Sequence, residues 1–178
     1  MSEFTSEINT IFSLLTVVGQ IAVLILLFLL FRGQGKATAF LGKYAVLFGF
    51  IISLGALLGS LLYSDIVGFE PCTLCWYQRI FLYPQVLLFG FALWKKRRDV
   101  VDYSLVLSFV GGVIAAYHYY GQMFNASALP CKAAEGVSPC AVRFFVEFSY
   151  VTIPMMSLTA FMLLIVFMCF GKKYTHVS

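Results

Sequence analysis

The sequence carries little charge. Only 11% of its 178 residues are Asp, Glu, Lys or Arg, whereas soluble domains carry about 25%. Hydrophobic residues make up 61% of the chain. This composition excludes a soluble globular protein, a disordered protein and a small secreted disulfide scaffold.

Histidine is also scarce. The chain has 2 His, His118 and His176, which lie far apart, and it contains no C-x-x-C-H motif, so a bis-His or c-type haem protein is disfavoured. The net charge of +4 does not indicate nucleic-acid binding, because the basic residues form short clusters between apolar runs. What the chain does have is long apolar segments and 5 Cys.

Five segments are expected to cross a membrane as helices, because only helices satisfy their own backbone groups in lipid. The third segment is apolar only over residues 80–94, so it spans the bilayer only if it begins near Pro71 and includes Arg79. The second contains Gly55-x-x-x-Gly59, a pattern that lets a neighbouring helix approach closely. The expected crossings cover residues 11–31, 44–64, 71–94, 103–124 and 151–170.

The basic clusters predict the topology. By the positive-inside rule these clusters lie in the cytoplasm, which places the N-terminus outside, the C-terminus inside and residues 65–79 and 125–150 on the outer face. No Lys or Arg precedes the first span, so we expect an anchor rather than a cleaved signal peptide. The clusters are Arg32, Lys36 and Lys43; Lys95 to Arg98; and Lys172 and Lys173.

Four cysteines fall in the two outer segments, where an oxidising environment allows disulfides to persist. Cys72 and Cys75 form a C-x-x-C, and Cys131 and Cys140 form a second pair. A helix that begins at Pro71 places the first pair in its first turn, where the helix dipole stabilises a thiolate. Two inert disulfides or a four-Cys zinc site are the alternatives. Cys169, near the inner end of the last span, is expected to be a buried apolar residue.

Two polar residues in the spans are candidates for binding an electron acceptor. Arg79 lies one helical turn beyond Cys75, and a charge at the membrane boundary is a functional-site hypothesis by default. It is expected to hold an anion or a polarised oxygen beside Cys75; the alternative is snorkelling towards lipid phosphates. His118 is expected either to deliver protons to a bound acceptor or to make a helix–helix contact.

The segment Pro71-Cys-Thr-Leu-Cys-Trp-Tyr-Gln-Arg79, together with the second outer Cys pair and Ile153-Pro154, resembles the DsbB family of membrane disulfide-generating proteins. It is most similar to the BdbC branch associated with Gram-positive bacteria. The resemblance implies an all-α membrane protein with a four-helix core over residues 44–172. Residues 1–43 would then be an extra transmembrane helix with a cytoplasmic loop, and residues 173–178 a cytoplasmic tail.

The resemblance also implies an activity. A DsbB-like protein reoxidises a soluble extracytoplasmic thioredoxin-fold partner of the DsbA or BdbD type and passes the electrons to menaquinone or ubiquinone. The partner attacks the Cys131–Cys140 disulfide at Cys131, the released Cys140 attacks Cys72, and Cys75 becomes the thiolate beside the quinone. Arg79 supports that thiolate, and His118 falls near the quinone pocket. No metal is expected.

Three competing interpretations stay open at this level. A vitamin K epoxide reductase-like protein also has a helical bundle with two Cys pairs, but its C-x-x-C lies in a late helix. A structural membrane protein would have inert disulfides, and a metal-handling protein would bind zinc. The resting disulfide pairing is also open: either within each loop or between the loops.

Overall fold

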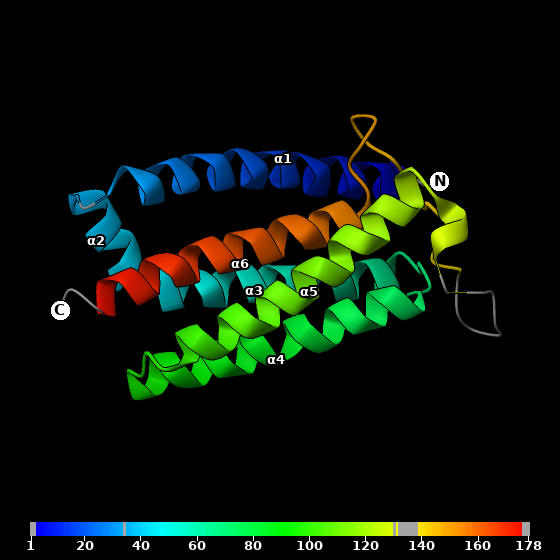
Figure 1. Ribbon diagram of the computed structural model, residues 1–178. Helices are drawn as coiled ribbons and strands as arrows, with labels where there is room; N and C mark the ends of the chain where they lie inside the picture. The colour runs from blue at the N-terminus through cyan, green and yellow to red at the C-terminus, as the bar shows by residue number, and fades with distance from the viewer. Residues whose placement is uncertain (1–2, 34, 130, 132–138, 176–178) are drawn as a thin grey trace.

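The computed structural model describes residues 3–33, 35–129, 131 and 139–175, and over these residues the chain is helical (Figure 1). Its regular structure there is six α-helices, a π-helical turn, a short 3-10 turn and one isolated bridge between Glu147 and Val151. This confirms the all-α fold class. The helices are α1 (Glu3–Arg32), α2 (Lys36–Lys43), α3 (Ala45–Leu61), α4 (Thr73–Lys95), α5 (Val100–Met123) and α6 (Ile153–Thr175), with the π-helix η1 (Leu62–Ile66) continuing α3 and the 3-10 turn η2 (Ala126–Ala128) following α5.

Four of the helices form a closed bundle. α3 packs on α4, α4 on α5, α5 on α6, and α6 back on α3. α1 lies alongside α6 outside this ring, and α2 packs across the end of α6 (Figure 1). The bundle interior is filled by large apolar side chains with almost no exposed surface: Phe89, Phe161, Leu164, Met168 and Phe170.

In the part of the chain that the structure describes, four helices are long and apolar enough to cross a membrane: α1, α3 with η1, α5 and α6. α4 has 23 residues, a sufficient length, but carries more polar side chains. One of them, Gln85, is fully buried, and its side-chain oxygen accepts hydrogen bonds from Ser104 (2.6 Å) and Ser108 (3.2 Å) of α5. Hydrogen bonds of this kind hold polar residues between membrane helices, and α4 stays a predicted crossing.

Some helix limits differ from the sequence-based expectations. α4 begins at Thr73, so the expectation that Pro71 is its first residue was wrong; Cys72 caps the helix instead. α1 begins at Glu3 rather than near Ile11, because a helix continues into polar surroundings. The short helix α2 was not predicted. Its start is held by Thr38, whose hydroxyl accepts from the Gly35 N–H and donates to the Gly35 carbonyl.

The two ends of the bundle differ in character. At one end α4 begins, α5 ends and residues 139–152 lead into α6; we call it the cysteine end. At the opposite end α1, α4 and α6 all finish with basic residues in their last turns. We call this the basic end.

The Gly55-x-x-x-Gly59 motif does not bring two helix backbones together as expected. A Cβ added at Gly55 would meet nothing within 4 Å, and one at Gly59 would lie 2.7 Å from the Phe12 ring of α1. Another tight glycine contact lies within the bundle, where the Phe161 ring of α6 lies directly against Gly111 of α5. Of the two glycines of the motif, Gly55 therefore leaves open space, whereas Gly59 admits a side chain of α1.

We predict that Gly111→Ala destabilises the bundle by about 1–3 kcal/mol, because the added methyl overlaps the Phe161 ring in a filled core. Gly112→Ala is the matched control, since a Cβ there would lie at an ordinary 3.6 Å from Phe161. Thermal unfolding in detergent, followed by circular dichroism, measures both. Equal midpoints for the two variants would contradict the packing described.

Candidate functional site

The first cysteine pair lies at the start of α4. Cys72 is the capping residue with extended backbone, and its Sγ accepts a hydrogen bond of 3.2 Å from the backbone N–H of Cys75. In most helices a Ser, Thr, Asp or Asn oxygen accepts this bond. The cap places Cys75 in the first turn and leaves Cys72 buried, with 4% of its surface exposed.

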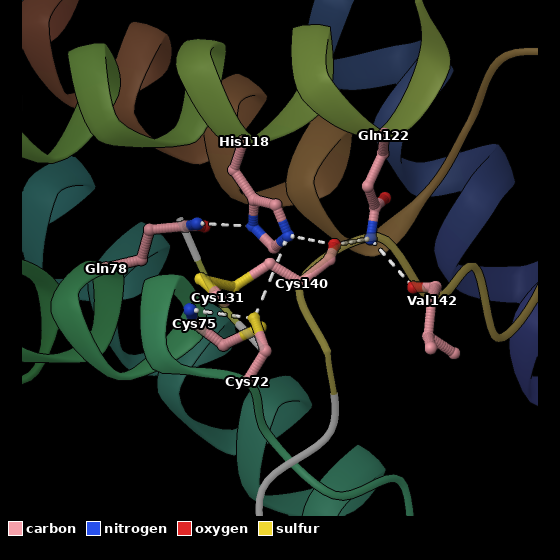
Figure 2. The surroundings of a disulfide bond; sticks show 8 residues. All are labelled: Cys72, Cys75, Gln78, His118, Gln122, Cys131, Cys140 and Val142. Carbon is pink, nitrogen blue, oxygen red and sulfur yellow. Dashed lines mark hydrogen bonds between the residues drawn. A yellow bond between two sulfur atoms is a disulfide. The ribbon is translucent and has the colours of Figure 1, made fainter. Parts of the chain in front are cut away.

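The second pair is a closed disulfide, Cys131–Cys140, whereas Cys72 and Cys75 are free thiols (Figure 2). Cys140 is fully buried, and its Sγ lies within 4.8 Å of both Cys72 Sγ and a ring nitrogen of His118. This answers the pairing question for this state of the protein. It also puts a thiol within a short movement of the disulfide sulfur that it would exchange with.

His118 of α5 contacts one cysteine of each pair (Figure 2). Its Nδ1 lies 3.0 Å from the Gln78 amide nitrogen, and its Nε2 lies 3.0 Å from the Cys140 carbonyl oxygen and 3.7 Å from Cys72 Sγ. If the Gln78 NH₂ donates to Nδ1, Nε2 carries a proton and donates towards Cys140 and Cys72. Gln122, one turn further along α5, donates to the carbonyls of Cys140 (3.1 Å) and Val142 (2.8 Å).

These contacts favour a Cys72 thiolate. A hydrogen bond from the Cys75 side chain, followed by the hydrogen bond and charge of His118, lowers the pKa of Cys72 to about 5, although burial opposes ionisation. A thiolate is the nucleophile in disulfide exchange. The position of Cys72 at a helix N-terminus adds to the same effect.

Arg79 is directed at α3. Its Nε donates to the Ser60 hydroxyl (3.0 Å), its Nη2 donates to the Ser60 carbonyl (3.2 Å), and its guanidinium lies 5.1 Å from the Trp76 ring. Tyr83 also donates to the Ser60 hydroxyl. A guanidinium has five N–H donors, so the two bonds to Ser60 fix Arg79 and leave other donors for a ligand.

A cavity of about 590 Å³ opens beside Arg79, between α1, α3, α4 and α6. Cys75 lines it, and Cys75 also lines a much smaller pocket of about 20 Å³ that contains Cys72, His118 and Cys140. Cys75 therefore borders two compartments. One holds the other cysteines, and the other has a size typical of small-molecule sites.

Tyr63 is a cavity residue that sequence reasoning missed. Its side chain is buried, with 6% exposed, and its hydroxyl has no hydrogen-bond partner among the described residues. Buried hydroxyls are normally paired, so a polar group in the cavity would satisfy it. Ser60 was also missed as the partner of Arg79. Gln78, three residues after Cys75, could have been found, because that spacing puts both residues on one helix face.

His118 lies apart from the large cavity. Cys75 and Arg79 line that cavity, but His118 does not; it lines the small pocket instead. Its contacts are with the cysteines and Gln78, so its expected part in binding a cofactor stays a prediction. Cys169 is partly buried near the basic end in α6.

The arrangement is poorly suited to a structural metal. Cys72, His118 and Cys140 could present three ligand atoms to one ion. However, Cys140 is bonded to Cys131 and has no thiolate to offer in this state. Structural zinc sites need four ligands, and their cysteines are thiolates.

The fold and site define a multi-pass helical membrane protein with a reduced and an oxidised Cys pair in contact. The family model described as "Disulfide bond formation protein DsbB" matches residues 42–171, and the chain belongs to this family. It is a membrane disulfide bond formation protein and a disulfide oxidoreductase by family.

Similar relatives include proteins of Bacillus species. The "Probable disulfide formation protein C" of Bacillus cereus is 43% identical over 122 residues, which are 67% of this chain and 85% of the relative. The "Disulfide bond formation protein C" of Bacillus subtilis is 41% identical over 122 residues, 68% of this chain and 88% of the relative. These names confirm the expected resemblance to the BdbC branch. No solved structure matches the chain significantly.

We predict that His118→Ala raises the pKa of Cys72 above 5, and that Cys75→Ala raises it further, because each removes a group that stabilises the thiolate. The ultraviolet absorbance of the thiolate, followed against pH and corrected with Cys72→Ser, measures this. Since the folded-state pKa lies below the ordinary value of 9.0, ionised Cys72 stabilises the fold fully above pH 9. That stabilisation is lost as the pH falls to about 5. An unchanged titration in both variants would contradict this account.

We also predict that a disulfide forms between Cys72 and Cys140 once their present partners are removed. In the double variant Cys75→Ser, Cys131→Ser, the two remaining sulfurs lie within 4.8 Å, and side-chain rotation brings them to bonding distance. Mild oxidation, proteolysis and mass spectrometry detect the cross-linked peptides. Cys169 lies near the basic end, so the yield of Cys72–Cys169 cross-links measures the random background. A yield of Cys72–Cys140 cross-links no higher than this background would contradict the geometry.

Proposed function

We propose that this chain reoxidises a soluble extracytoplasmic DsbA-like protein of thioredoxin fold and passes the electrons to a membrane quinone, so that exported proteins acquire disulfides. The observation that carries the proposal is the position of Cys75. It borders both the pocket of the other cysteines and the cavity beside Arg79. A sulfur in this position can exchange with thiols on one side and deliver electrons on the other.

The exchange begins at the disulfide Cys131–Cys140. A thiolate of the reduced partner attacks Cys131 and releases Cys140 as a thiolate; the partner's second thiol then resolves the mixed disulfide, leaving the partner oxidised and Cys131 reduced. Cys140 attacks Cys72 of a Cys72–Cys75 disulfide and releases Cys75. Cys131 then attacks Cys140 and releases Cys72. The two electrons and two protons of the partner now reside on Cys72 and Cys75.

The structure corresponds to that last state, with Cys131–Cys140 closed and Cys72 and Cys75 reduced. In it the negative charge is on Cys72, stabilised by Cys75 and His118. When Cys72 is instead bonded to Cys140, Cys75 is the free sulfur of the pair. It is then the group left beside Arg79 at the large cavity.

The cavity suits a quinone. The end near Cys75 offers Arg79, Ser60 and the unpartnered hydroxyl of Tyr63, which can donate hydrogen bonds to a carbonyl oxygen. The rest of the lining is mostly apolar, as a prenyl chain requires. A bound quinone supplies a two-electron acceptor, which thiols need for net disulfide formation. Arg79 and Tyr63 would hold its head, and Cys75 would be the adjacent sulfur.

The expected sidedness follows from charge. The cysteine end carries both Cys pairs, whereas the last turns of α1, α4 and α6 place basic residues at the opposite end. The positive-inside rule assigns that end to the cytoplasm. Both pairs are then exposed to the oxidising side, with the N-terminus outside and the C-terminus inside.

The inert-disulfide alternative is less well supported. It requires two permanently closed pairs, but Cys72 and Cys75 are thiols. Burial of Cys72 within 4.8 Å of Cys140 also serves no purpose in a protein whose bridges never exchange. The vitamin K epoxide reductase-like alternative has no support from the family match.

To test this, purified protein in detergent is mixed with a reduced thioredoxin-fold partner, with and without quinone. The readouts are oxidation of the partner and the absorbance of the quinone. We expect Cys75→Ala to abolish quinone reduction. Arg79→Ala should raise the KM for quinone about 10–100-fold, since hydrogen bonds from a charged donor contribute about 1.5–3 kcal/mol.

Matched controls separate these effects from general damage. Cys169→Ala removes a thiol at the basic end, and Arg97→Ala removes an exposed arginine; both should retain wild-type rates. If the wild-type protein oxidises no partner and consumes no quinone, the proposed function is refuted.

A further inference from the structure

α1 lies outside the family match, which begins at residue 42, yet it forms part of the large cavity. Phe12, Leu15, Thr16 and Gly19 of this helix line it, opposite residues of α3, α4 and α6. The four-helix ring alone would leave this side of the cavity without protein. A role for α1 in holding the ligand of this cavity rests on the proposed function.

α1 is fixed to the bundle at specific points. Gly19 lies against α6, where an added Cβ would be 3.1 Å from the Thr159 methyl. Gln20 donates to the Thr159 hydroxyl (3.3 Å) and accepts from the Tyr150 hydroxyl (2.8 Å). Contacts from two sides of one glutamine hold the helix at a fixed rotation, so the same face of α1 always points into the cavity.

Nearer the cysteine end, Phe12 reaches from α1 to α3. Its ring fills the space at Gly59, where an added Cβ would lie 2.7 Å away. It also meets the Tyr63 ring edge-on, at 5.6 Å between centroids. Phe12 thus bridges α1 and α3 and supports the side chain whose hydroxyl is unpartnered.

The cavity changes character along its length. Near the cysteine end its lining includes Arg79, Ser60 and Ser64. Further towards the basic end the lining is mostly apolar. Thr16 and Thr159 also line it, but their hydroxyls donate to carbonyls of their own helices, and Gly55 leaves open space there. The apolar part is lined by Leu15, Gly19, Ile51, Ile52, Leu82 and Leu163.

We infer that α1 is the wall that holds the isoprenoid tail of the quinone, between itself and the Gly55 face of α3. A polar head fits at Arg79, and the apolar length beyond it faces α1. α1 therefore selects for quinones that carry a tail. A phospholipid acyl chain has similar chemistry, and the test separates these two occupants.

The test compares a prenylated quinone with a tail-less quinone of the same head group. Its readouts are the dissociation constant for each quinone and the amount of prenylated quinone retained through purification, besides the KM of each. Leu15→Ala trims the wall, and Leu14→Ala is its matched control: the adjacent leucine has a similar exposure, 56% against 60%, but does not line the cavity.

We expect Leu15→Ala to weaken binding of the prenylated quinone about tenfold, because the shorter side chain removes apolar surface that the tail buries. Binding of the tail-less quinone should not change, and Leu14→Ala should change neither. Gly55→Leu, which fills the open space from α3, should weaken the prenylated quinone alone. This variant tests the same apolar part of the cavity from α3 instead of α1.

The other outcomes overturn the inference in distinguishable ways. If wild type reduces quinone but Leu15→Ala and Gly55→Leu bind both quinones normally, α1 holds no tail although the proposed function stands. Equal losses for both quinones indicate damage to the head site, and recovery of phospholipid in place of quinone identifies an acyl chain as the occupant. If wild type neither binds nor reduces any quinone, the proposed function itself fails.

Discussion

The hydrogen bond from the Cys75 N–H to Cys72 Sγ starts α4, and the positions of the other site residues follow from it. Once Cys72 caps the helix, the helical repeat places Cys75, Gln78 and Arg79 on one side of α4. Gln78 then meets His118 of α5, and Arg79 meets Ser60 of α3. A thiol that caps a helix also gains the positive field of the N-terminus, so one interaction sets both the geometry and the charge of the site.

Cys75 separates two environments that favour opposite chemistry. On one side, Cys72 lies among hydrogen-bond donors, which favour the thiolate needed for exchange. On the other, a mostly apolar cavity contains a guanidinium that has no carboxylate among its hydrogen-bond partners in the described residues. Because Ser60 binds Arg79 through neutral oxygens, the positive charge is positioned without being neutralised. It remains able to act on a ligand or on a nearby thiolate.

Much of this arrangement could be predicted from the sequence, because apolar length and cysteine position are local properties. The helical membrane fold and the family were evident from the apolar segments and from residues 71–79. Three features depend on contacts between distant segments. His118 lies beside Cys72 and not at the large cavity, Gly55 faces open space instead of a helix, and the Tyr63 hydroxyl finds no partner within the described part of the chain. The sequence of a glycine pair is the same whether the space beside it holds a helix or a ligand.

The packing of α1 gives that glycine pair a physical explanation. Phe12 fills the space at Gly59, so one of the two glycines does admit a neighbour, but the neighbour is a side chain of the extra helix. Gly55, about one turn away, remains open because α1 is held by α6 through Gly19 and Gln20 and does not lean further towards α3. The space between α1 and α3 is thus set by two anchor points on different helices.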